Sequence, residues 1–119
     1  MITRDQKFAI DAYEKVSRVK KEDASSYGSM AHKLPILIRT AGLAQALAFV
    51  SSRGKVSQKQ LIEDISETIG KKEMLLERAR AAELREYMYL TKQVMAALLW
   101  YKRFAQSVLG IDASIEENE

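Results

Sequence analysis

The chain has 119 residues, of which 47% are hydrophobic and 29% are charged, and its formal net charge is +3. This length and composition predict one globular domain that buries a core, and they exclude disorder as the default state. Because the sequence contains no cysteine, disulfides, cysteine-ligated zinc and thiol catalysis are excluded. We expect a soluble, cytoplasmic protein, since no apolar run could cross a bilayer and charged residues interrupt the N-terminus.

The first 26 residues predict a helix followed by a loop. Thr3 and Gln6 form a capping-box pattern, and apolar residues recur behind them at helical spacing as far as Lys21. Residues 22–26 are polar and small, which is typical of a loop.

Two further helices are predicted before residue 55. Apolar residues recur at helical spacing from Met30 to Ala41, with Pro35 inside the pattern. Proline removes one backbone hydrogen bond, so we expect the first of these helices to kink there. A shorter apolar stripe begins at Leu43 and ends at Gly54.

Another helix is predicted between Ser57 and Gly70. Ser57 and Gln60 repeat the capping-box pattern, and apolar residues carry one helix face to Gly70. No phosphate-binding loop motif surrounds any glycine here, so we interpret the spaced glycines as helix ends. These glycines are Gly28, Gly42, Gly54 and Gly70.

The C-terminal part follows one long helical pattern. From residue 71 to Leu109 there is neither glycine nor proline, and we expect a bend near Ala81 and Ala82. Apolar residues cover two faces of the last helix, which is typical of a helix packed on both sides. Because no segment alternates between apolar and polar residues, the predicted fold class is all-α: a single compact bundle of five to six helices with a long, doubly packed C-terminal helix.

The charges are sorted along the chain. Residues 24–62 contain five basic side chains and no acidic one, and residues 87–111 contain three basic side chains and no acidic one. Acidic side chains are concentrated in residues 63–86 and in the tail, 112–119. Bases without an acid three or four positions away predict contact with an external anion. Pairing through space with residues 63–86 is the alternative.

Enzyme signals are weak in this sequence. His32 is the single histidine, and we expect it to be exposed or to cap a helix rather than to belong to a catalytic triad. Glu63, Asp64 and Glu67 share one helix turn and could hold Mg²⁺, but a solvated helix face is the simpler interpretation. We therefore predict no catalytic residue, no metal site and no cofactor.

Basic residues on the last helix form a line. Arg85, Lys92 and Arg103 are separated by 7 and 11 residues, which places them within about 20° of one another around a helix. Such a row suits the phosphate backbone of a nucleic acid, although bases can also simply keep a surface soluble. Four tyrosines could stack on nucleobases, although a place in the core or at its rim is the simpler interpretation for each of them. They are Tyr27, Tyr87, Tyr89 and Tyr101.

Two segments and their spacing carry a family resemblance. The first contains Met30, Ala31, Lys33, Leu34, Pro35 and Leu37, followed by Gly42, Leu43, residues 45–49, Ser52 and Gly54. The second contains Leu90, Thr91 and residues 100–105, and Ala12 with Tyr13 adds a weaker match. In this order the sequence resembles the small helical subunit of the Cmr complex, the type III-B CRISPR effector that carries a guide RNA and targets invading RNA. We find none of this resemblance in residues 56–82.

The resemblance implies a structural subunit without a catalytic centre of its own. Its copies are expected to stack along a filament of backbone subunits, which carry the cleavage activity, and to help form the basic channel for guide and target RNA. The candidates for phosphate contact within or beside the matching segments are Lys33, Arg39, Arg53, Lys55, Lys102 and Arg103. Lys92, Arg18 and Lys21 join them on geometry alone.

Two other functions remain open from the sequence. One is a helix-turn-helix DNA-binding regulator that uses residues 57–69 and the following helix, and the other is an adaptor that contacts only protein.

We divide the chain into a helical domain, 1–111, and an acidic tail, 112–119. The tail is expected to be a frayed, solubilising end, and competition with RNA for the basic surface is the alternative.

Overall fold

The computed structural model describes residues 2–70 and 75–113. Within these ranges it contains six α-helices, a short 3₁₀ helix and no strand, which confirms the all-α prediction. The helices are α1 (Arg4–Ser17), α2 (Ala24–Ala41), α3 (Leu43–Arg53), α4 (Val56–Thr68), α5 (Leu75–Ala81) and α6 (Leu84–Ser107), and the 3₁₀ helix η1 (Lys21–Asp23) joins α1 to α2.

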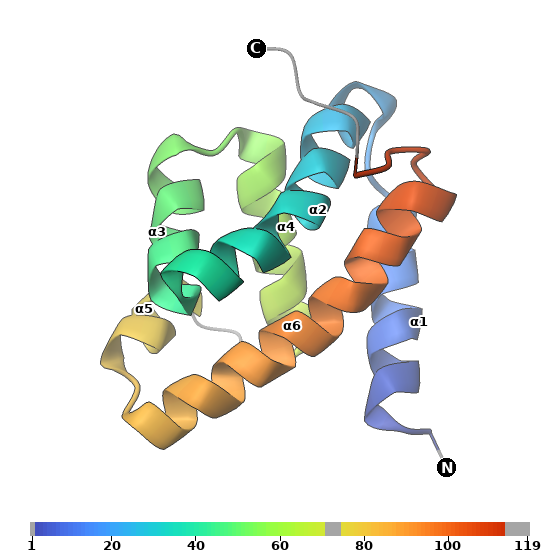
Figure 1. The fold of residues 1–119 in the computed structure, drawn as a ribbon. Helices are drawn as coiled ribbons and strands as arrows, with labels where there is room; N and C mark the ends of the chain where they lie inside the picture. The colour runs from blue at the N-terminus through green and yellow to red at the C-terminus, as the bar shows by residue number, and fades with distance from the viewer. Residues whose placement is uncertain (1, 71–74, 114–119) are drawn as a thin grey trace.

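The long helix α6 is central to the arrangement. It crosses the front of the molecule in Figure 1, packs against α1 and α2 on its two sides, and also contacts α4. Helices α3 and α5 pack together on the far side of α2, and α4 contacts both of them. The prediction of a doubly packed C-terminal helix is confirmed.

The core is built from one face of α6 and the facing sides of its neighbours. α6 buries Leu90, Val94, Leu98 and Tyr101 at intervals of three or four residues, as an amphipathic helix does. The other large apolar side chains that are almost fully buried include Leu34, Leu43, Leu47, Leu61 and Ile65. Trp100 packs at the edge of this cluster and is only partly buried.

The start of α1 follows the prediction, but its end does not. The Thr3 hydroxyl accepts a hydrogen bond from the Gln6 backbone N–H (3.1 Å), and the Gln6 side chain accepts one from the Thr3 N–H (2.8 Å). This is the predicted capping box. The helix ends at Ser17 rather than near Lys21.

The segment predicted as a loop, 22–26, is mostly helical. η1 covers its first residues, and α2 begins at Ala24. Two side chains in the first turn of α2 hydrogen-bond to α4, Ser26 to Ser57 and Tyr27 to Asp64. The loop prediction is wrong because these tertiary contacts outweigh the local preference of small polar residues.

The start of α4 differs from the prediction by two residues. Ser57 was expected to cap this helix, but the N-cap is Lys55, whose backbone N–H donates to the Gln58 side chain (3.0 Å). Ser57 lies in the first turn, buried against Ser26 of α2. Its hydroxyl is therefore used between helices rather than at the helix end.

Three of the four spaced glycines end helices, as predicted. Gly42 and Gly70 have φ values of 90° and 79°, which favour glycine, and Gly54 caps α3. Gly28 is the exception, because it lies inside α2. A Cβ at Gly28 would lie 2.8 Å from the Cβ of Ile111, so this position is kept small by the segment after α6.

Two further predictions concern Pro35 and the end of α5. α2 passes through Pro35 as one helix, and its ribbon changes direction partway along its length (Figure 1). The chain breaks rather than bends after Ala81, and α6 starts anew with Glu83 as its N-cap. The predicted beginning of the long helix at 71–74 lies outside the described residues.

His32 fastens the chain after α6 to α2. The expectation of an exposed histidine is wrong, because its side chain is 6% exposed and its Nε2 lies 2.8 Å from the carbonyl oxygen of Ile111. The Ile111 N–H in turn donates to the carbonyl of Ala105 (2.9 Å). These bonds hold residue 111 against the bundle, and most of the acidic tail, 114–119, lies outside the described residues.

None of the described helices combines the length and the apolar content needed to cross a membrane.

We predict that the effect of Gly28→Ala on stability changes sign with residue 111. In the natural background the new Cβ meets Ile111, so the variant should lose about 1 kcal/mol despite the better helix propensity of alanine. In an Ile111→Gly background the same change should gain about 0.5–1 kcal/mol. Urea unfolding of the four proteins measures both effects. Destabilisation of equal size in both backgrounds would contradict the contact.

Candidate nucleic-acid interface

The nine predicted phosphate contacts are all exposed. They come from every part of the described fold except α5: Arg18 after α1, Lys21 in η1, Lys33 and Arg39 on α2, Arg53 at the end of α3, Lys55 before α4, and Lys92, Lys102 and Arg103 on α6. The predicted line on α6 also faces solvent, because Arg85 is exposed with Lys92 and Arg103. This line lies opposite the buried face of the helix.

The bases on α2, α3 and α6 have no acidic partner in the part of the chain that the structure describes. Across residues 2–70 and 75–113, ion pairs join Lys15 to Asp11 (3.2 Å) and Glu67 (3.7 Å), Arg4 to Asp5 (3.5 Å) and Arg80 to Glu77 (4.0 Å). None of these pairs involves a predicted phosphate contact. The alternative for the basic stretches was pairing through space with residues 63–86. The described residues do not show such pairing for six of the bases, which are Lys33, Arg39, Arg53, Lys92, Lys102 and Arg103.

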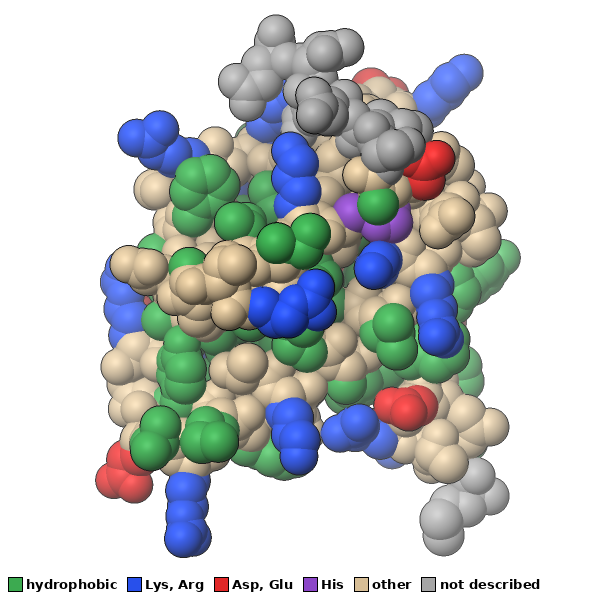
Figure 2. Space-filling view, in the orientation of Figure 1, with side chains coloured by type: hydrophobic (Ala, Val, Ile, Leu, Met, Phe, Trp, Pro, Cys, Tyr) green, Lys and Arg blue, Asp and Glu red, His purple; other side chains and the backbone are tan. Residues whose placement is uncertain are grey.

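The basic side chains are spread over the surface rather than gathered at one point. Figure 2 shows the face on which α2 and α6 lie in front, with many Lys and Arg side chains and few acidic ones. Hydrophobic side chains lie between the basic ones on this face. The surface therefore suits an extended polyanion better than a single small anion.

The four tyrosines considered for stacking have different environments. Tyr27 and Tyr101 are buried in the core, which is the simpler interpretation of the two, so neither can stack on a base. Tyr87 is half-buried, and its hydroxyl accepts from the Ala44 N–H (3.0 Å). Tyr89 is exposed, and its hydroxyl accepts from the Gln93 side chain (2.7 Å).

A set of aromatic contacts that the sequence did not reveal lies between α1 and α6. Tyr13 meets Phe104 edge to face, with ring centres 5.4 Å apart, and Phe104 stacks with Trp100 at 6.0 Å. The Arg103 guanidinium lies 4.9 Å from the centre of the Trp100 ring. We call Tyr13, Phe104, Trp100 and Arg103 the aromatic row. The sequence held a signal for the exposure of Tyr13, because the buried residues Phe8, Ala12 and Val16 are four residues apart and Tyr13 lies about 100° around the helix from Ala12.

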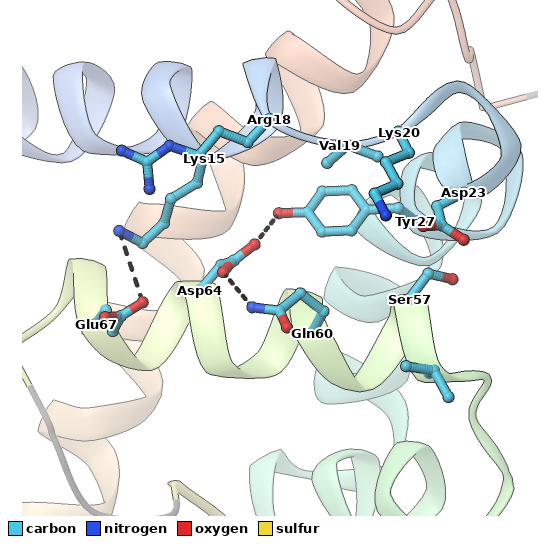
Figure 3. Close-up of a pocket in the computed structure, with 11 residues that line it drawn as sticks. Lys15, Arg18, Val19, Lys20, Asp23, Tyr27, Ser57, Gln60, Asp64 and Glu67 are labelled. Carbon is cyan, nitrogen blue, oxygen red and sulfur yellow. Dashed lines mark hydrogen bonds and ion pairs between the residues drawn. The ribbon is translucent and has the colours of Figure 1, made fainter.

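A cleft of about 340 Å³ opens between the end of α1 and α4. Figure 3 shows Lys15, Arg18 and Lys20 on its upper wall and Asp64 and Glu67 on α4 below. Bases and acids of similar number face each other here, so the cleft offers no net charge to an anion. Lys15 spans it, since its ammonium pairs with Glu67.

The buried carboxyl of Asp64 is the most perturbed acid in the cleft. It is 6% exposed and accepts hydrogen bonds from the Tyr27 hydroxyl (2.7 Å) and the Gln60 amide (2.8 Å). Burial raises its pKa, and the two hydrogen bonds oppose that rise. Burial and the nearby Asp64 charge also raise the pKa of Tyr27. Asp64 thus joins helices instead of lying on a solvated face as the sequence predicted.

The same residue connects to α6 through its backbone. The Tyr101 hydroxyl donates to the carbonyl of Asp64 (3.1 Å) and lies 2.6 Å from the Thr68 hydroxyl, which bonds to Asp11 of α1. Burial raises the pKa of Tyr101. Among the described residues, no three acidic or histidine side chains converge as metal ligands would.

The pair of helices proposed for DNA reading is poorly suited to it. Helix α5 has seven residues, and it buries Leu75 and Ala79 against the core. Its exposed Arg80 is paired with Glu77 (4.0 Å). Little of this helix is left to enter a groove.

Comparison with known proteins gives consistent matches. The family model "CRISPR-associated protein (Cas_Cmr5)" matches residues 4–108. The CRISPR system Cmr subunit Cmr5 of Thermus thermophilus is 50% identical over 112 residues, covering 92% of this chain and 98% of the relative. The crystal structure of a CRISPR-associated Cmr5 family protein from the same organism matches with a TM-score of 0.80 and 48% identity, covering 92% of this chain and 99% of that chain. The matched range includes residues 56–82, in which the sequence resemblance had not been found.

We predict that the two buried tyrosines make the fold sensitive to alkali. Above about pH 10 the unfolded chain loses their protons while the folded chain keeps them, so stability should fall as pH rises. The slope from each tyrosine should be about half of 1.4 kcal/mol per pH unit at pH 10 and should approach that value near pH 11. Tyr27→Phe and Tyr101→Phe should each reduce the slope of unfolding free energy against pH by that amount, measured by urea unfolding between about pH 9.5 and 11. Unchanged slopes in both variants would refute the assignment.

Proposed function

The chain belongs to the Cmr5 family of CRISPR-associated proteins and is therefore a subunit of the Cmr complex. From this premise, we propose that it is a cytoplasmic, non-catalytic structural subunit of the type III-B effector, which stacks along the backbone subunits and offers a basic surface to guide and target RNA. The observation that carries the RNA part is the set of exposed bases on α2, α3 and α6 that have no acidic partner among residues 2–70 and 75–113.

A role without catalysis is supported by how the reactive groups are used. His32 is buried, with one ring nitrogen bonded to a backbone carbonyl. Asp64 is buried and bonded to Tyr27 and Gln60. Both side chains are thus occupied by contacts that join separate segments of the fold, a structural use that differs from the substrate contact that general acid–base catalysis requires.

Contact with other subunits is supported by apolar side chains on the outer face of α6. Leu84, Met88 and Leu99 are 73%, 61% and 45% exposed. Their spacing places them within about 60° of one another around the helix, so they form one stripe. Exposed apolar stripes of this kind mark protein interfaces, and other Cmr subunits, including further copies of this chain, are the partners that we propose for it.

The division into a helical domain, 1–111, and an acidic tail, 112–119, remains part of the proposal. Residue 111 is held by His32 and Ala105, which supports a domain boundary immediately after it.

We predict that Lys102→Glu with Arg103→Glu weakens RNA binding by the assembled complex. Both side chains are exposed on α6, so the fold should survive the change. Binding is expected to fall by at least about tenfold at low salt, and the slope of log affinity against log salt should decrease by about 1.4, since each phosphate contact on a single strand contributes about 0.7. Filter binding across a salt series measures both quantities.

The matched control is Lys7→Glu with Lys59→Glu, which makes the same change in net charge at two exposed bases outside the proposed set. This control should bind RNA almost as the natural subunit does. Equal loss in both variants would mean that overall charge, and not the surface of α6, determines binding.

A further inference from the structure

One end of the aromatic row is open to solvent. Tyr13 is 53% exposed, although its contact with Phe104 holds the ring in place from behind. A ring fixed in this way presents an apolar surface that loses little conformational freedom when a ligand stacks on it. Proteins that bind single-stranded nucleic acids use aromatic rings of this kind as platforms for bases.

The other end of the row carries a positive charge. The Arg103 guanidinium lies over Trp100, yet the residue stays exposed. Contact with an indole ring fixes the guanidinium plane but leaves its N–H donors free for a phosphate. A stacking surface and a phosphate-binding group are thus joined through Phe104 and Trp100 in one continuous set of contacts.

The charges around the row favour the same ligand. α6 has no acidic residue from Tyr87 to its end. On α1 the acidic neighbour of Tyr13 is Glu14, which projects about 100° around the helix from it. A strand with its phosphates toward α6 would therefore stay away from this carboxylate.

We propose that the aromatic row is a stacking site for an unpaired nucleobase, with the base on Tyr13 and a phosphate of the same strand on Arg103. This inference rests on the proposed RNA-binding function, and it adds that the RNA is single-stranded where it passes the seam between α1 and α6. The site does not read sequence, because every base has a face that can stack.

The test uses the full chain and its single tryptophan, Trp100, as the reporter. Two probes of equal length are compared at low salt: an oligoadenylate and an abasic ribose-phosphate oligomer, which carries the same phosphates without bases. The oligoadenylate should bind at least about fivefold more tightly than the abasic strand, and it should quench Trp100 fluorescence more strongly at saturation.

Three variants locate the effect. Tyr13→Leu keeps an apolar contact with Phe104 but removes the ring, so it should bind both strands equally. Tyr13→Phe keeps the ring and should retain the preference for the oligoadenylate. Tyr89→Leu removes an exposed tyrosine of α6 that lies outside the row, and it should also retain the preference. Circular dichroism checks that each variant is folded.

The outcomes separate this inference from the function on which it rests. If the natural chain binds both strands equally well, the phosphate surface stands and the stacking site is wrong. If neither strand binds the full chain, the stacking site is wrong, and the proposed RNA surface is then decided separately by the filter binding of the assembled complex. If Tyr13→Leu keeps the base preference but no longer assembles into the Cmr complex, the row is a protein contact and the inference is overturned.

Discussion

The hydrogen bond from Tyr27 to Asp64 (2.7 Å) fixes the helices on which the rest of the structure depends. It joins α2 to α4, and the backbone carbonyl of Asp64 receives the Tyr101 hydroxyl of α6 (3.1 Å). A buried carboxyl is costly unless donors satisfy it, so an alternative packing of α2 would leave Asp64 without its partner. Burial raises the pKa of Asp64, and the hydrogen bonds from Tyr27 and Gln60 oppose that rise. Polar contacts of this kind contribute less to net stability than the apolar core does, but they exclude competing arrangements of the same helices.

The inward position of Tyr101 determines what α6 presents to solvent. With Tyr101 in the core, helix geometry turns Lys102 and Arg103 away from it. Meanwhile Asp64 is bonded inside the bundle, and Lys15 pairs with Asp11 of its own helix and with Glu67 across the cleft. Asp64 is thus used between helices, whereas the bases of α2, α3 and α6 are exposed and remain available to a polyanion.

Helical periodicity was sufficient to predict the fold class, because apolar side chains that repeat every 3.6 residues form one face of an α-helix and do not fit a strand. It could not predict that α2 begins at Ala24, since that turn depends on Ser26 and Tyr27 meeting α4. Of the candidate site, the exposed bases were predicted from the sequence, but the positions of the tyrosines were not. Exposure of the bases followed from local spacing, whereas the tyrosines of α6 could not be sorted: Tyr87 and Tyr101 lie on the same side of the helix, and only tertiary packing buries Tyr101 while it leaves Tyr87 half-buried.

The outer face of α6 offers two kinds of surface side by side. Leu84, Met88 and Leu99 form an apolar stripe, and Lys92 and Arg103 lie about 20–100° around the helix from its members. An apolar stripe is stable in an assembly only when protein covers it, while the bases need access to phosphates. If both surfaces act as proposed, RNA runs along the border between this subunit and its neighbour rather than across the middle of either. Because the bases are spread over several helices, the single chain does not define one path for the RNA strand. The neighbouring subunits then determine that path, and this chain forms one side of it.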